Sequence, residues 1–283
     1  MNKISVLINK IEKLENELAT EEKNILEFAT LKLKSKLAES DAETLTLQKK
    51  IIDKQENDFQ SLGLTRQSAI KKLDALLEEL IGKKFTLSDS EHWLLFSSLS
   101  NSDNVPSKIL EIGTANGITA AILASLFPDA EIVTIDLPQE NEKFRLSYNR
   151  EESFNQYADS RDTLIANFNN VSFVTTNSVN LNNWSEKSFD LIWVDGAHGY
   201  PVLPLDLYNS CRLIKKNGVV VVDDVFINLR KQDEMYRSTA AVQTLKLFKE
   251  TGLIRDYKLI RKRLALKYNF KNLNEKFLGV VKF

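Results

Sequence analysis

Hydrophobic and polar positions follow two different periods along this chain. In the first part, apolar residues recur at spacings of three and four, as they do along one face of an α-helix. The apolar positions at the start are Ile4, Leu7, Ile11, Leu14, Leu18, Ile25 and Phe28. Amphipathic pattern continues over 45–52 and 70–81, and Gly63 is the expected break between helices. We therefore expect a helical extension over residues 1–80, as a coiled coil or a helical hairpin.

From residue 108 onward, short apolar runs alternate with helical patterns. The runs predicted as strands are 108–112, 131–135, 171–175, 189–194 and 218–222. Two further β-like segments cover 257–268, which could hold a helix instead, and 277–283. Helices are expected over 118–127, 153–168, 202–214 and 238–250. Runs as continuously apolar as 219–222 fit strands that are covered on both faces. The alternation predicts a second domain, 81–283, of α/β class with a doubly wound, mostly parallel, seven-stranded sheet.

The distribution of glycine and proline supports this division into two parts. The 283 residues include only 9 glycines and 5 prolines, and all the prolines and most of the glycines follow residue 104. Such composition excludes collagen-like and proline-rich disordered chains. The single Cys211 excludes an intrachain disulfide and is expected to be packed rather than reactive.

Charge and hydropathy narrow the setting further. The net charge is −1, which favours neither nucleic acid nor a membrane surface as a partner. No apolar run reaches the ~18 residues of a membrane span, and no signal peptide is recognisable, so we expect a cytoplasmic protein. Basic residues dominate from Lys258 to the end, as either a solvated face or the grip for an anionic partner.

Acidic residues gather where the predicted strands end. Glu111 lies at the end of the first strand, Asp136 ends the second, Asp195 the fourth, and Asp223 and Asp224 the fifth. In doubly wound sheets, ligands bind beyond the carboxyl ends of the strands. An aspartate there can also cap the following helix, which accounts for one or two of these residues more easily than for all of them.

The segment LEIGTANGIT, residues 110–119, follows the first strand and holds two glycines, Gly113 and Gly117. A dinucleotide site would need G-x-G-x-x-G, but Ala115 and Ile118 replace its second and third glycines. A phosphate-binding loop would need Gly-Lys-Ser/Thr, which the chain lacks. Asp136 comes 23 residues after Gly113 and is well placed to bind a ribose diol.

These motifs together resemble the S-adenosylmethionine (SAM) site of class I methyltransferases. The form LEIG-x-x-x-G-x-Thr is similar to cation-dependent O-methyltransferases, the group with catechol and caffeoyl-CoA enzymes. FDLIWVDGAHGY, residues 189–200, and KKNGVVVVDDV, residues 215–225, look more like bacterial small-molecule and sugar O-methyltransferases. The resemblance covers about residues 85–283 and implies a Rossmann-like methyltransferase sheet.

Carried over residue by residue, the resemblance implies a cofactor site. The loop would shape the pocket for the methionine end of SAM, Asp136 would accept hydrogen bonds from the ribose hydroxyls, and Asn177 and Ser178 would lie near the adenine. Asn177 stands where the family often has an acid. The implied cofactor-binding residues are Glu111, Gly113, Thr114, Ala115, Gly117, Asp136, Leu137, Asn177, Ser178 and Asp195.

The resemblance also implies a metal ion and a base. Asp195, Asp223 and Asp224 end neighbouring strands and would bind Mg²⁺ or another divalent cation, whose charge lowers the pKa of a substrate hydroxyl. A base must accept the hydroxyl proton, and His198 and Asp195 are the two candidates. His198 could instead be a loop histidine that hydrogen-bonds the backbone.

We therefore expect a SAM-dependent O-methyltransferase acting on a hydroxyl of a sugar, a glycan or another small molecule. One alternative is N-methylation of RNA or protein, in which the basic C-terminal stretch would bind the substrate. Another is a catalytically inactive scaffold protein with a methyltransferase fold. The helices of residues 1–80 would serve homo-oligomerisation or act as a lid or docking arm, and the long connection 137–160 could be a second lid.

Overall fold

The computed structural model describes residues 42–87, 89–142, 145, 154–229, 237–262 and 276–283. The chain divides into two compact units. One consists of Met1–Lys54 and Leu264–Leu273, of which the described part is the beginning of helix α3 (Ala42–Gln60). The other consists of Gln55–Arg263 and Asn274–Phe283 and contains the sheet. The apolar seam expected at residues 4–28 and much of the connection expected as a lid lie outside the described residues.

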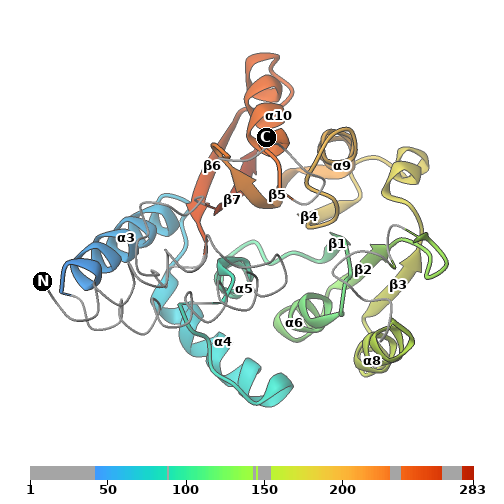
Figure 1. Ribbon diagram of the computed structural model, residues 1–283, viewed down its shortest axis with the longest axis horizontal. Coiled ribbons are helices and arrows are strands. Elements are labelled where there is room, and N and C mark those ends of the chain that lie inside the picture. The colour runs from blue at the N-terminus through green and yellow to red at the C-terminus, as the bar shows by residue number, and fades with distance from the viewer. Residues whose placement is uncertain (1–41, 88, 143–144, 146–153, 230–236, 263–275) are drawn as a thin grey trace, which may run out of the picture. The chain divides into compact units, whose positions relative to one another are not determined.

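The larger unit is built on a seven-stranded sheet in the order β3-β2-β1-β4-β5-β7-β6 (Figure 1). The parallel strands are β1 (Lys108–Ile112), β2 (Glu131–Asp136), β3 (Val171–Thr175), β4 (Phe189–Val194) and β5 (Ile214–Phe226). Strand β7 (Lys276–Lys282) is antiparallel to both β5 and β6 (Asp256–Arg261). This confirms the α/β class and the mostly parallel, doubly wound sheet.

Helices cover both faces of this sheet, and each face has its own apolar core (Figure 1). Side chains that alternate along a strand enter opposite cores: Ile109 packs in one, and Leu110 and Ile112 in the other. The first core also receives α4 (Arg66–Ile81), α5 (Glu91–Leu99) and α6 (Ile118–Leu126), with α8 (Phe154–Ala166) beside α6. The second receives α9 (Val202–Leu213) and α10 (Ala240–Glu250).

Helix α4 is part of this larger unit. Ala69, Leu73 and Leu77 lie on one side of it at intervals of four residues and are fully buried in the first core. Gly63 has φ 76° in the turn between α3 and α4, as its place in the pattern predicts. The unit that carries the sheet therefore includes α4 and begins at Gln55.

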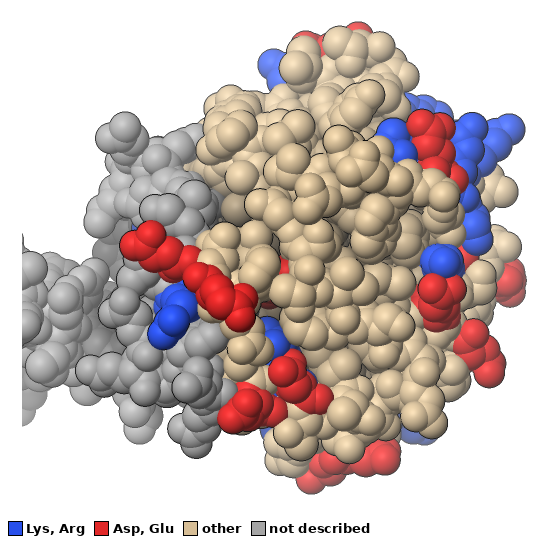
Figure 2. Space-filling view, turned by 90° about the vertical axis from the view of Figure 1, so that its right-hand side faces the viewer, with Lys and Arg blue, Asp and Glu red and all other residues tan. Residues whose placement is uncertain are grey.

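The described surface holds few features that suggest a membrane or a nucleic acid. Within the described residues, no helix combines the length and hydropathy needed to cross a bilayer. On the face shown in Figure 2, most of the area carries no charged side chain, and basic residues at its border are interleaved with acidic ones. The described residues on that face form no broad basic surface of the kind that neutralises phosphates.

Candidate functional site

The loop after β1 packs its backbone against the end of β4. Gly113 has φ 101°, a conformation that favours glycine, and its N–H donates to the Ile135 carbonyl at 2.9 Å. A Cβ atom at this position would lie 2.7 Å from the carbonyl carbon of Asp195 and 2.9 Å from the nitrogen of Gly196. Glycine is required here because the glycine loop and the loop that carries Asp195 touch directly.

Asp136 fastens the same loop to the end of β2. Its carboxylate accepts hydrogen bonds from the backbone N–H of Ala115 at 2.9 Å and of Leu137 at 2.8 Å. Ala115 has φ 47°, in the left-handed region that few non-glycine residues adopt. The structure thus brings Asp136, Ala115 and Leu137 together, as their proposed roles in one cofactor site require.

Glu111 faces the interior beneath this loop. Its side chain is buried, and its Oε2 accepts a hydrogen bond from the Thr134 hydroxyl at 2.6 Å. The Thr134 hydroxyl in turn lies 2.6 Å from that of Thr114 in the loop. Burial raises the pKa of Glu111 to about 8. The hydrogen bond from Thr134 lowers this pKa, and the charge of Asp136 raises it. Glu111 therefore supports the loop from below through Thr134.

Asn177 and Ser178 follow β3 at the same edge of the sheet. Asn177 caps the short 3-10 helix η3 (Ser178–Asn183), its Oδ1 accepting from the N–H of Val179 at 3.0 Å. Asn209 of α9 donates to the Ser178 carbonyl at 3.4 Å. The amide of Asn177 thus has a structural task that would compete with a contact to adenine.

Asp195 and His198 form the second half of the site. His198 Nε2 lies 3.7 Å from Asp195 Oδ1, and the imidazole is only 4% exposed. Burial lowers the pKa of His198, which keeps the ring neutral near pH 7, against the raising effect of Asp224 and Asp223. Burial raises the pKa of Asp195, and the nearby carboxylate of Asp223, with which Asp195 is hydrogen-bonded, raises it further.

A lysine that directly follows β6 enters this acidic group. Lys262 Nζ donates to the carboxylate of Asp223 and, at 2.7 Å, to Asp224 Oδ1. Lys276 Nζ donates to Asp224 Oδ2 at 2.6 Å. Burial disfavours the charged form of Lys262, but the carboxylates outweigh it and raise its pKa. Within the described residues, no group of three Asp, Glu, His or Cys side chains is arranged to hold a metal ion.

A bulge in β5 explains how two successive aspartates reach one lysine. Neighbouring side chains in a regular strand point to opposite faces of the sheet. The pairing of β5 with β7 shifts register between Val222 and Val225, and Asp224 has φ 45°. The extra residue turns both carboxylates toward Lys262.

Sequence reasoning missed Lys262 and Asp206. Lys262 stood out only as one of many basic residues near the C-terminus, 38 positions after Asp224. Asp206 of α9 is 1% exposed, and its Oδ2 would lie 3.7 Å from a Cβ on Gly196. Burial raises the pKa of Asp206 to about 7. An aspartate at an apolar position of the helical pattern 202–214 was the available signal.

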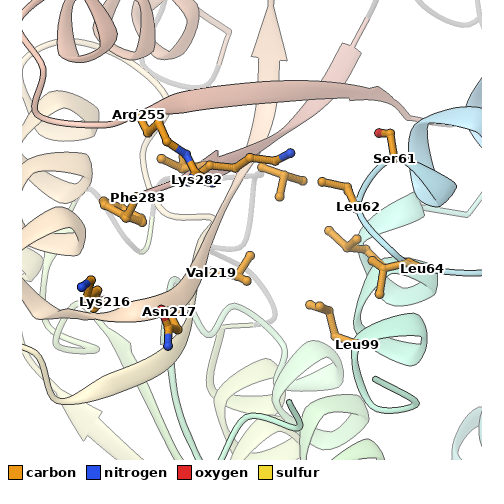
Figure 3. Close-up of a pocket in the computed structure, with 14 residues that line it drawn as sticks. Ser61, Leu62, Leu64, Leu99, Lys216, Asn217, Val219, Arg255, Lys282 and Phe283 are labelled. Carbon is orange, nitrogen blue, oxygen red and sulfur yellow. The ribbon is translucent and has the colours of Figure 1, made fainter. Parts of the chain in front are cut away.

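A well-defined cavity lies elsewhere, at the opposite edge of the sheet (Figure 3). Its volume is about 360 Å³, and it is lined by apolar side chains such as Leu62 and Leu99 together with Lys216, Arg255 and Lys282. These residues lie near the start of β5 and the end of β7, which runs the other way. Ligands of parallel sheets bind beyond the carboxyl ends of the strands, so this cavity is separate from the candidate site.

The chain is similar in fold to solved methyltransferases. The O-methyltransferase TomG of Streptomyces achromogenes, involved in tomaymycin synthesis and solved with SAM, is 21% identical over 81% of this chain and 96% of its own, with a TM-score of 0.46. Cofactor-bound Rv0187 from MTB is 20% identical over 74% and 94%, with a TM-score of 0.42. Precorrin-6y C5,15-methyltransferase of Geobacter metallireducens is 15% identical over 73% and 92%, with a TM-score of 0.44.

The match to a sequence family covers the site itself. Residues 110–225 match the family described as a methyltransferase domain, and this range runs from the start of the glycine loop to the paired aspartates of β5. It includes the loop, Asp136, Asn177, Ser178, Asp195 and His198. Residues 110–225 are therefore similar to a methyltransferase domain, in the part of the chain that holds the motifs.

Proposed function

We propose that this protein is an O-methyltransferase that transfers the methyl group of SAM to a hydroxyl of a sugar, a glycan or another small molecule. The observation that carries the proposal is the contact between Gly113 and the backbone of Asp195. Because of this contact, a cofactor held by the glycine loop would lie beside Asp195 and His198. Methyl transfer to a hydroxyl needs the methyl donor and a base close enough for both to contact the same acceptor group.

The cofactor half of the site rests on the loop and on Asp136. A carboxylate can accept about four hydrogen bonds, so the two from Ala115 and Leu137 are compatible with further bonds from ribose hydroxyls. Gly113, Thr114 and Gly117 would shape the space for the methionine end, with Glu111 supporting the loop. Asn177 and Ser178 would border the adenine.

When bound, SAM would supply a methyl group for the acceptor oxygen, with S-adenosylhomocysteine as the product that remains. Nε2 of His198 would accept the hydroxyl proton. His198 suits this role because burial holds its ring neutral. Asp195 is the alternative base, because its Oδ1 lies 3.7 Å from the same nitrogen.

The resemblance implies a magnesium ion at the ends of β4 and β5. As arranged, Asp195, Asp223 and Asp224 do not fit a divalent cation, because the ammonium group of Lys262 already lies against two of the three carboxylates. No step of the proposed reaction therefore uses a metal ion.

The extension before the domain belongs to the same proposal. We infer that the helices of residues 1–80 serve homo-oligomerisation, with a lid or docking role as the alternative. The amphipathic pattern of residues 4–28 supports this, because an unpaired apolar helix face favours association. The cytoplasm remains the expected location.

The test is a transfer assay with SAM labelled in its methyl group and a panel of sugars, glycans and other small-molecule hydroxyl compounds. We expect label on oxygen in the product. His198→Ala should lower kcat by roughly 10²- to 10⁴-fold with unchanged SAM affinity by calorimetry, since a base and not a cofactor contact is lost. Label that appears only on nitrogen of amine-containing acceptors would contradict the proposal, and full activity of His198→Ala would transfer the role of base to Asp195.

A further inference from the structure

The acidic group at the end of β4 and β5 contains its own cation. The side chain of Lys262 is 2% exposed, and its ammonium group donates to both Asp223 and Asp224. The same positive charge lowers the pKa of Asp195, but burial and the charge of Asp223 outweigh it and raise that pKa. Long lysine side chains are rarely fully buried unless they are paired in this way.

The fold places this lysine at the site by its strand order. Strand β6 lies beyond β7, and because β7 is antiparallel to both of its neighbours, β6 and β5 end at the same edge of the sheet. Lys262 follows β6 directly, and its backbone N–H donates to the Lys276 carbonyl at 2.9 Å. This bond fixes the start of the side chain, and the bulge in β5 turns the two aspartates toward its end.

A divalent ion and this lysine are alternatives. Mg²⁺ requires oxygen ligands at about 2.0–2.1 Å in octahedral geometry, and those oxygens would be the ones that now accept from Lys262. An ion bound beside the ammonium group would add two positive charges next to a buried one, which is unfavourable in a site of low dielectric constant. Lys276 adds a second positive charge on Asp224.

We propose that the ammonium group of Lys262 is the resident cation of this site in place of a divalent metal ion, and that methyl transfer by this protein needs no added metal. The inference rests on the proposed function for its catalytic part only. Lys262 acts as a positioning residue: it neutralises Asp223 and Asp224 and holds them against Asp195, which faces His198. The resemblance to cation-dependent enzymes would then extend to the carboxylates but not to the ion.

Binding of Mn²⁺ alone, followed by electron paramagnetic resonance, tests the site without any acceptor. We expect the wild-type protein to bind no Mn²⁺ at Asp223, whereas Lys262→Met should gain one site that a second change, Asp223→Asn, removes. Lys215→Met is the matched control, because Lys215 pairs with Asp190 at 2.8 Å at the other end of the sheet and should gain no site. Calorimetry with SAM on each variant shows that the fold is intact.

Two results would overturn the proposal. One is a wild-type Mn²⁺ site that Asp223→Asn abolishes. The other is transfer activity that EDTA abolishes and Mg²⁺ restores in the wild-type protein. If the assay finds no acceptor at all, the proposed function fails, but the Mn²⁺ titration still decides whether Lys262 takes the place of the metal ion.

Discussion

At the scale of single residues, Glu111 shows how burial changes the role of a motif residue. The resemblance assigned it to the cofactor pocket, yet its carboxyl group lies in the interior and accepts from Thr134. Its pKa of about 8 lies above the ordinary value of 4.5, so the neutral form is favoured in the folded protein. Below pH 4.5 this preference costs nothing, because the unfolded chain is protonated too; stability is lost as pH rises from there through 8.

This difference predicts the effect of Glu111→Gln on stability. Glutamine keeps the size and hydrogen-bonding capacity of neutral glutamic acid without an ionisable proton. The free energy of unfolding of the variant, relative to that of the wild type, should therefore increase between pH 5 and pH 8 by on the order of a few kcal/mol. Urea denaturation at several pH values measures it. Glu131→Gln, at an exposed position of β2, is the control, and a pH-independent difference for Glu111→Gln would refute the burial argument.

At the scale of elements, the site depends on how loops join neighbouring strands. The loop after β1 is bonded to the end of β2 through Asp136 and packs on the end of β4 through Gly113. In each link, the two residues that meet are far apart in sequence. Damage to one strand end should consequently be detected as a loss of cofactor binding.

Asp136→Ala is the corresponding experiment. The variant loses the acceptor for Ala115 and the proposed acceptor for the ribose hydroxyls. A hydrogen bond to a charged group contributes about 1.5–3 kcal/mol, so SAM should bind roughly ten- to a hundredfold more weakly in calorimetry. Asp129→Ala, exposed beyond the other end of α6, should bind SAM normally. Equal affinities for the two variants would remove Asp136 from the site.

The elements themselves were largely predictable from sequence. Strands β1, β3 and β4 have the bounds predicted from sequence. In β1 and β4 most side chains are buried and apolar, whereas β3 at the edge of the sheet has none that is buried. Strand β5 begins at Ile214 rather than 218, since Lys215, Lys216 and Asn217 interrupt the pattern at the sheet edge. The ion pairs of Lys262 could not be predicted, because a contact over 38 residues has no local pattern.

At the scale of the whole molecule, the larger unit begins at Gln55, and this changes how the N-terminal helices should be tested. Removing residues 1–75 would delete Ala69 and Leu73, which are fully buried in the core. A cut before Gln55 leaves that core complete. The two deletions therefore separate the role of the extension from that of the fold.

We expect the chain without residues 1–54 to bind SAM as the full chain does. Light scattering should show fewer copies per particle than for the full chain. The chain without residues 1–75 should fail to fold, because a buried Leu→Ala change alone costs about 2–5 kcal/mol and this deletion removes more. If the chain without residues 1–54 forms particles with the same number of copies as the full chain, the extension does not hold copies together. That result would support the lid or docking role.

The position of Lys262 along the chain also has a consequence for the order in which the site is made. Synthesis proceeds from the N-terminus, and domains begin to fold while it continues. The glycine loop and Asp136 emerge first, and the carboxylates of β4 and β5 follow, before any of the residues of β6 and β7 exist. A nascent chain that stops short of β6 already contains the glycine loop and Asp136, but its aspartates lack both lysines. Under the proposed function, the site is complete only when the last strands have been synthesised.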